Sequence, residues 1–236
     1  MFFTGMTIST MLWGPLVVLS FPLPFTRRYR ISQQWSRFNI WWLKKTCHLD
    51  YLLEGLENLP TNPVIVLAKH QSTWETIFLH QFFPPLSWVV KRELLWIPFF
   101  GWALALIRPI AINRATTNAA MKQVLKQGKD RLDNGQWVLI FPEGTRMEPG
   151  TKGHYHGGGA LLATRSGYPI LPLTHNAGNY WPRHSFIKYP GTIRIVFGPL
   201  IDSQGKSAKK LNLQTEEWIE TTSAQIASTH SDGQRS

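Results

Sequence analysis

The chain has 236 residues, a hydrophobic content of 43% and a formal net charge of +11. A chain of this length can form one sizeable domain and a small appendage. The basic excess predicts an anionic partner, either nucleic acid or an anionic membrane surface. Eleven Trp residues favour the membrane, because Trp concentrates at membrane–water interfaces, and the sequence has none of the common nucleic-acid-binding motifs. The single Cys47 excludes an internal disulfide and a cysteine zinc site.

The N-terminal stretch carries no charged residue before Arg27. Residues 6–25 are long enough to reach across the hydrocarbon core of a bilayer, but Pro15 interrupts them. The stretch lacks the basic start and the cleavage site of a signal peptide. Two predictions stay open, a kinked spanning helix and a helix lying in the interface. Arg27, Arg28 and Arg30 follow, and the positive-inside rule places the rest of the chain on the cytoplasmic face, at the inner membrane in a bacterium.

The segment that follows has helical periodicity. Its apolar positions are Trp35, Phe38, Trp42 and Leu43, and its basic positions include Arg37, Lys44 and Lys45. The pattern fits a core helix whose aromatic side chains pack inside a domain. It also fits a helix at the membrane surface, which we favour because tryptophans beside basic residues suit the headgroup region. We therefore assign residues 1–55 to membrane-associating helices.

Strand and helix patterns alternate from Pro63 onward, which predicts an α/β domain over residues 56–228, followed by a polar tail at 229–236. A helix is predicted over roughly residues 116–133, between a threonine cap and Gly135. The apolar stretch 94–106 fits either a buried segment or a tunnel wall or membrane-facing surface. The predicted strands are Val64 to Ala68, Trp88 to Val90, Ile110 to Ile112, Trp137 to Phe141, Ile170 to Leu173 and Thr192 to Phe197.

A histidine and a carboxylate stand directly after the first of these strands, at His70 and Glu75. In open α/β sheets, ligands bind at the carboxyl edge of the strands. A separation of five is not a same-face helical spacing, so the two side chains meet only if the chain turns between them. A carboxylate bonded to one imidazole nitrogen leaves the other free to accept a proton. By itself, the spacing fits an ordinary polar pair as well.

A second block, Phe141-Pro142-Glu143-Gly144-Thr145-Arg146, also follows a predicted buried strand. With His70 to Glu75, Ile112-Asn113-Arg114 and the block from Tyr168 to Leu173, it resembles the ordered motifs of the 1-acyl-sn-glycerol-3-phosphate acyltransferases, within the glycerolipid acyltransferases. The resemblance covers the chain from about Leu56 to Leu200. Glu75 stands where the family has Asp, which keeps the carboxylate. Asn113 also replaces an Asp, which removes a charge and indicates that this position is not the essential one.

The resemblance implies a mixed central sheet flanked by helices, with an N-terminal membrane anchor. It implies transfer of a fatty acyl group from a thioester to the sn-2 hydroxyl of lysophosphatidic acid, giving phosphatidic acid. His70 would act as general base, oriented by Glu75. Arg114 and Arg146 are candidates for the acceptor's phosphate, since guanidinium groups match phosphate oxygens. Gly144 would allow close backbone approach, Thr145 would donate hydrogen bonds, and Glu143 would bind the glycerol hydroxyl or hold an arginine.

The expected partners are membrane lipids, lysophosphatidic acid and an acyl donor, either acyl-CoA or acyl carrier protein. No cofactor and no metal are expected, and nucleic acid is not a partner. Another lysolipid acceptor is the nearest alternative. A hydrolase would normally need a Gly-x-Ser-x-Gly elbow, which the sequence lacks. A non-catalytic lipid-binding protein is the third alternative, with Glu75 and Asn113 as marks of lost activity.

Overall fold

The computed structural model describes residues 1–113 and 116–232. The strands are β1 (Leu49–Glu54), β2 (Ile65–Ala68), β3 (Leu86–Lys91), β4 (Ile110–Ile112), β5 (Trp137–Ile140), β6 (Ile170–His175) and β7 (Gly191–Phe197). The helices are α1 (Phe2–Leu19), α2 (Phe25–Cys47), α3 (Trp74–Phe82), α4 (Phe100–Leu106), α5 (Thr117–Asp133), α6 (Gly158–Ser166), α7 (Ala177–Tyr180) and α8 (Ala208–Asp232), with 3-10 turns η1 (Leu56–Asn58) and η2 (Arg92–Trp96).

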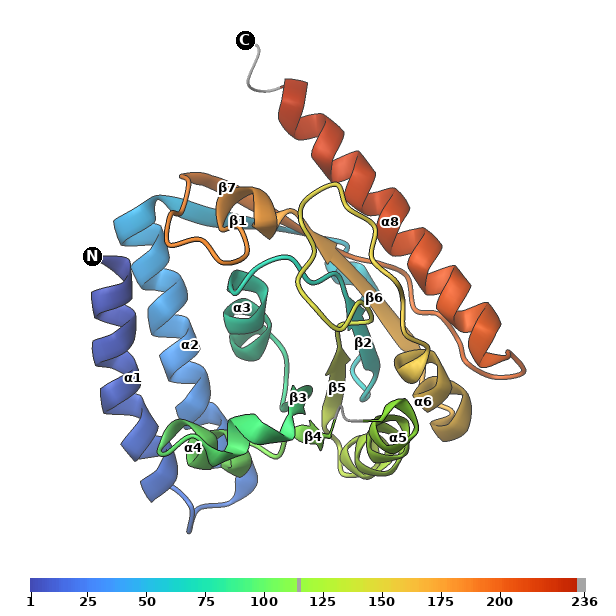
Figure 1. The fold of residues 1–236 in the computed structure, drawn as a ribbon, viewed down its shortest axis with the longest axis horizontal. Coiled ribbons are helices and arrows are strands. Elements are labelled where there is room, and N and C mark those ends of the chain that lie inside the picture. Colours follow the sequence, from blue (N-terminus) through green and yellow to red (C-terminus); the bar gives the residue numbers. More distant parts are fainter. Residues whose placement is uncertain (114–115, 233–236) are drawn as a thin grey trace.

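The strands form one seven-stranded sheet in the order β1-β7-β6-β2-β5-β3-β4, with helices on both faces (Figure 1). Neighbouring strands are parallel except β6 and β7, which are antiparallel. The predicted mixed α/β sheet is therefore confirmed. Because β2 lies between β5 and β6 and is parallel to both, the segments that follow these strands emerge at one edge of the sheet.

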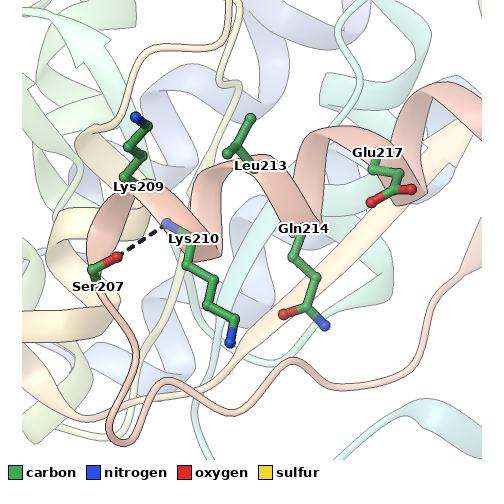
Figure 2. A pocket seen from close by; sticks show the side chains of 6 residues that line it. All are labelled: Ser207, Lys209, Lys210, Leu213, Gln214 and Glu217. Carbon is green, nitrogen blue, oxygen red and sulfur yellow. Dashed lines mark hydrogen bonds between the residues drawn. The ribbon is translucent and has the colours of Figure 1, made fainter.

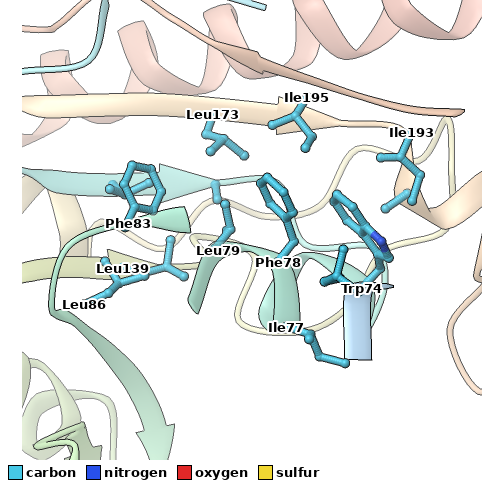
Figure 3. Close-up of a cluster of buried hydrophobic side chains, with 14 of the residues drawn as sticks. Trp74, Ile77, Phe78, Leu79, Phe83, Leu86, Leu139, Leu173, Ile193 and Ile195 are labelled. Carbon is cyan, nitrogen blue, oxygen red and sulfur yellow. The ribbon is translucent and has the colours of Figure 1, made fainter. Parts of the chain in front are cut away.

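Alternate residues of the central strands enter two separate cores, as the two-residue period of a strand requires. On one face, Val66 of β2 packs with Leu139 of β5, under α3 and α2. On the other face, Ile65 and Leu67 of β2 pack beneath α5, α6 and α8. Figure 3 shows the first core, where Trp74 and Phe78 of α3 stack with ring centroids 4.7 Å apart, among the following labelled neighbours: Ile77, Leu79, Phe83, Leu86, Leu139, Leu173, Ile193 and Ile195.

The two N-terminal helices pack side by side, and α2 separates α1 from α3 (Figure 1). The aromatic stripe predicted for α2 faces α1: the Trp35 indole donates to Thr10 Oγ1 at 3.1 Å, and Phe38 stacks on Trp13 at 5.7 Å between centroids. The stripe is thus partly covered by α1, whereas Trp41 is 49% exposed. The opposite side of α2 packs on α3, where Ser32 Oγ contacts the His80 ring at 3.0 Å.

The outer face of α1 is apolar and exposed. Helix α1 is long and apolar enough to cross a membrane, and only 17% of it is buried against the rest of the protein. Its exposed large side chains are Ile8, Met11, Leu12, Leu16 and Leu19. The stretch 94–106, for which a buried and an exposed interpretation were open, is largely exposed at its aromatic positions, with Trp96 at 66% and Phe99 at 60%.

Two predicted boundaries are wrong. Residues 49–54, assigned to the N-terminal helices, form β1 and pair in parallel with β7, from Leu49 beside Gly191 to Glu54 beside Val196. Helix α2 stops because His48 adopts a left-handed conformation with φ of 51°, and no Gly or Pro marks this stop in the sequence. At the other end, α8 extends to Asp232 and includes the beginning of the predicted tail.

Candidate functional site

The first block turns directly after β2, and the turn brings His70 and Glu75 together. His70 follows the carboxyl end of the strand, and Glu75 lies in the first turn of α3. His70 Nδ1 and Glu75 Oε1 are 2.8 Å apart. The carboxylate accepts a hydrogen from Nδ1 and leaves Nε2 as the basic nitrogen. The His70 side chain keeps 14% of its surface exposed, so a substrate can reach it.

Three donors hold the Glu75 carboxylate in place. Besides His70, the backbone N–H groups of Gln71 and Ser72 donate to Glu75 Oε1 at 2.9 and 2.8 Å. Glu75 is fully buried. Burial alone would raise its pKa, but the nearby His175 and His70 and the Ser72 N–H outweigh burial and lower the pKa of Glu75. The residue that pairs with His70 is therefore a carboxylate held in one orientation.

His175, at the end of β6, lies behind this pair. Its Nε2 donates to the Lys69 carbonyl at 2.9 Å and lies 3.9 Å from Glu75 Oε2, while its Nδ1 accepts from the Ala177 N–H at 3.2 Å. Burial lowers the pKa of His175, against the effect of Glu75. This fully buried imidazole fixes the peptide before His70 and lies next to Glu75.

The third block closes over His70 from the neighbouring strand. Phe141, the first residue after β5, stacks on the His70 ring at 3.9 Å between centroids and an interplanar angle of 12°. Gly144 has φ of 66°, which lets its N–H return to the Phe141 carbonyl at 3.1 Å in a tight turn. The chain then comes back toward His70, whose carbonyl accepts from the Met147 N–H at 2.8 Å. First and third blocks thus form one unit.

The remaining predicted site residues differ in position. Thr145 is exposed and Arg146 is half-buried in the loop that turns over His70. Glu143, predicted to bind the glycerol hydroxyl or to hold an arginine, has no exposed side-chain surface and faces Lys69 instead, with Oε1 3.3 Å from Nζ. Glu143 thus meets a lysine in place of the expected arginine, and its contact with the glycerol hydroxyl stays a prediction. Arg114 lies outside the described residues, and its predicted role is not placed here.

A buried charged cluster supports the site from the α8 side. Lys69, the residue before His70, is 2% exposed in its side chain and pairs with Glu220 of α8 at 2.6 Å. Tyr155 donates to the same Glu220 oxygen at 2.7 Å. Burial raises the pKa of Glu143 to about 7, although Lys69 opposes the shift. The sequence pattern had not marked Lys69 or Glu220, because a charged residue in a motif normally predicts a solvated side chain.

A depression on the surface of α8 is remote from this chemistry. It has a volume of about 440 Å³ and runs along the outer side of α8 (Figure 2), lined by Ser207, Lys209, Lys210, Leu213, Gln214 and Glu217. Its lining residues belong to α8, apart from Ser207 just before that helix, so it is an open groove between side chains and no enclosed site. We place the site at His70, where the chemistry is. In the described part of the chain, no three His, Cys, Asp or Glu side chains gather closely enough to hold a metal ion.

Comparison with known proteins places this geometry in a family. A family model described as Acyltransferase matches residues 51–176. The curated 1-acyl-sn-glycerol-3-phosphate acyltransferase of Pseudomonas aeruginosa is 49% identical over 232 residues, covering 96% of this chain and 90% of the relative. This chain belongs to the acyltransferase family. A second such enzyme, from Chlamydomonas reinhardtii, is 30% identical over 80% of this chain and 56% of its own length.

The fold of this acyltransferase matches a solved structure as well. The crystal structure of the 1-acyl-sn-glycerophosphate (LPA) acyltransferase PlsC from Thermotoga maritima superposes with a TM-score of 0.78, at 23% sequence identity, over 96% of this chain and 93% of that chain. At this identity the match bears on the fold, and it supports the sheet order and helical layers described above. The resemblance noted in the sequence is thereby confirmed at the level of family and fold.

Proposed function

We propose that this acyltransferase moves a fatty acyl group from an acyl thioester to the sn-2 hydroxyl of 1-acyl-sn-glycerol-3-phosphate, giving phosphatidic acid. The observation that carries the proposal is the His70–Glu75 pair, joined at 2.8 Å on a sheet edge that the third block covers. The names of the curated relatives support the acceptor. The donor is acyl-CoA or acyl carrier protein, and no metal or cofactor takes part.

The proposed chemistry needs a general base and no acyl-enzyme, because the thioester is already activated. His70 Nε2 takes the proton of the acceptor hydroxyl as the oxygen attacks the thioester carbon. Glu75 stabilises the imidazolium formed in that step. The C–S bond then breaks, and His70 returns the proton to the departing thiolate. The stacking of Phe141 on the imidazole ring supports this role, because it holds the plane of the ring while Glu75 holds Nδ1.

The phosphate of the acceptor binds along the third block. Arg146 supplies a guanidinium, and Thr145 supplies an exposed hydroxyl. Gly144, at a positive φ that glycine adopts without strain, presents backbone to the ligand without a side chain. Arg114, by its position in the second block, remains a proposed phosphate ligand. Glu143 has a supporting role in this scheme, since it contacts Lys69 and no surface.

The acceptor and product are lipids, and the enzyme works at a membrane surface. The exposed apolar face of α1 supports membrane association. Arg27, Arg28 and Arg30 after that helix support a cytoplasmic position for the catalytic domain.

The test is acyl transfer by the purified full chain. Oleoyl-CoA and oleoyl-acyl carrier protein are offered with lysophosphatidic acid and, in parallel, with lysophosphatidylethanolamine and lysophosphatidylglycerol. We expect phosphatidic acid to be the dominant product, with only a residual rate left in His70→Ala. Glu75→Asp, which keeps the carboxylate, is expected to retain activity. A stronger reaction with another lysolipid would replace the acceptor, and no product from any pair would contradict the enzyme proposal and favour a non-catalytic lipid-binding protein.

A further inference from the structure

A second arginine lies beside the third block, contributed by a different part of the chain. The loop between α7 and β7 carries Arg183, whose Nη1 donates to the Arg146 carbonyl at 2.7 Å. The peptide group that carries this carbonyl also carries the Met147 N–H, which donates to the His70 carbonyl at 2.8 Å. One peptide group therefore separates the Arg183 guanidinium from the backbone of the general base.

Among the described residues, no side chain neutralises the charge of Arg183 or Arg146. In the part of the chain that the structure describes, neither guanidinium forms an ion pair with a carboxylate. Arg194, by contrast, pairs with Glu54 at 2.7 Å. Arg183 is half-buried and uses one N–H for the Arg146 carbonyl. A guanidinium has five N–H donors in a planar fork, so the others are available to a ligand.

The loop that carries Arg183 is fastened to the predicted membrane helix. Trp181 packs edge-on against Phe2 of α1 at 5.4 Å, and Phe186 contacts Phe3 at 5.3 Å. The ammonium of Lys188 lies 3.3 Å from the centre of the Phe3 ring. The loop extends toward the N-terminal end of α1 in Figure 1. Arg183 thus lies between helix α1 and the sheet edge that carries His70 and Glu75, which we call the catalytic edge. The headgroup of a lipid acceptor would approach His70 there.

We propose that Arg183 is a second phosphate-binding residue for the acceptor, next to Arg146, and that it favours a phosphomonoester headgroup over a phosphodiester. The proposal rests on the function proposed above. A phosphomonoester offers three terminal oxygens and close to two negative charges, whereas a phosphodiester has one charge and two free oxygens. Two guanidinium groups can both bind a phosphomonoester. With a phosphodiester, the second guanidinium contributes less to binding. Arg183 therefore affects the choice of acceptor more than the rate of turnover.

The test compares Arg183→Gln with Arg183→Lys in the full chain. We measure kcat and KM for lysophosphatidic acid and for lysophosphatidylglycerol, which differ in phosphate class. Loss of a charge-assisted hydrogen bond predicts that Arg183→Gln lowers kcat/KM for lysophosphatidic acid about 10- to 100-fold, mainly through KM. The value for lysophosphatidylglycerol should change far less. Arg183→Lys keeps the charge without the fork, and we expect an intermediate ratio.

The matched control is Arg165→Gln, an exposed arginine at the end of α6, which removes the same charge elsewhere. It should leave the acceptor ratio unchanged. An unchanged ratio in Arg183→Gln would overturn the proposal, and so would an equal loss with both acceptors, which would indicate a structural role. If the Gln variant does not fold, the Lys variant decides, because it keeps a donor for the Arg146 carbonyl.

A binding measurement separates this inference from the proposed function. Calorimetric titration with lysophosphatidic acid, added without an acyl donor, measures binding directly. If the wild type turns over and Arg183→Gln leaves the kcat/KM ratio of the two acceptors unaltered, only the role of Arg183 is contradicted. Binding by the wild type without turnover contradicts the proposed function, and a weaker titration in Arg183→Gln then still supports the phosphate site. A wild type that neither binds nor reacts overturns both.

Discussion

The catalytic edge and the N-terminal helical layer, formed by α1 and α2, differ in which side chains they bury. At the catalytic edge, charged side chains are buried: Glu75 has no exposed surface, and Lys69 is 1% exposed. In the helical layer, apolar side chains are exposed: Leu12 of α1 is 57% exposed and Leu16 of the same helix is 53% exposed. Each arrangement is costly for a protein considered alone in water.

The difference shows which environment stabilises each region. Buried charges keep their positions only when partners surround them, so the catalytic edge obtains a single geometry from its hydrogen bonds and ion pairs. Exposed apolar groups are stabilised when a lipid surface covers them, so the helical layer is completed by the membrane. The following changes test this contrast, from the largest expected effect to the smallest.

Removal of the charge on Glu75 should have the largest effect. Glu75→Gln keeps the shape of the side chain but no longer stabilises an imidazolium at His70. We expect kcat to fall by about 10²- to 10⁴-fold. The double variant His70→Ala/Glu75→Gln should be no worse than His70→Ala alone, because the two residues act as a unit. Initial rates for the three variants measure this, and additive losses would mean that Glu75 acts independently of His70.

Removal of the buried ammonium should unfold the catalytic edge. Lys69→Met leaves Glu143 and Glu220 facing each other without a cation. We expect a loss of about 3–5 kcal/mol in the free energy of unfolding, measured by urea denaturation. Lys44→Met is the matched control, because Lys44 forms a 2.6 Å pair with Asp50 while 58% exposed, and it should be neutral. Equal effects from the two lysines would refute the contrast.

The stability of the protein should depend on pH through Glu143. Its pKa is about 7 in the folded protein and close to the ordinary 4.5 when unfolded. Between these values the folded state binds the extra proton, so stability falls as pH rises and the loss is complete above pH 7. The loss is on the order of 3 kcal/mol. Glu143→Gln should remove it, which urea denaturation from pH 5 to 8 measures. Parallel pH profiles of wild type and variant would show that Glu143 is ionised throughout.

A single change on the outer face of α1 should have the smallest effect and should act only on membrane binding. Leu12→Asn removes one apolar side chain that a membrane would bury, which is worth about 1.5–3 kcal/mol or roughly 10- to 100-fold in partitioning to anionic vesicles. Urea denaturation should be unchanged. Leu213→Asn is the matched control, since Leu213 is 55% exposed on α8. Weaker vesicle binding by the α8 variant would place the lipid contact elsewhere.

Much of the fold was predictable because apolar patterns record burial directly. The runs before His70 and Phe141 are buried at every position of β2 and β5, and the helix expected at 116–133 is α5. The strand β1 was missed for a physical reason as well. Its residues 49–54 follow a helix without a Gly or Pro between them, and the strand is stabilised by pairing with β7, far away in the sequence.

The candidate site was predictable in part. The meeting of His70 and Glu75 depends on a local turn between neighbours in sequence, which the spacing and the family resemblance together indicated. The contact of Glu143 with Lys69 was not predicted because Lys69 follows another strand, and Arg183 was not marked because its loop between α7 and β7 shows no pattern of its own.

By itself, the sequence determined the two buried strands β2 and β5, the residues that follow them, and the apolar N-terminus. These features depend on the order of apolar and polar residues within short segments. Only the tertiary structure decided which charged groups share a buried pocket, which face of α1 stays open, and which loop brings Arg183 to the third block. Those outcomes depend on contacts between residues tens to more than a hundred positions apart. Such contacts form only when the sheet is assembled, so local sequence patterns do not predict them.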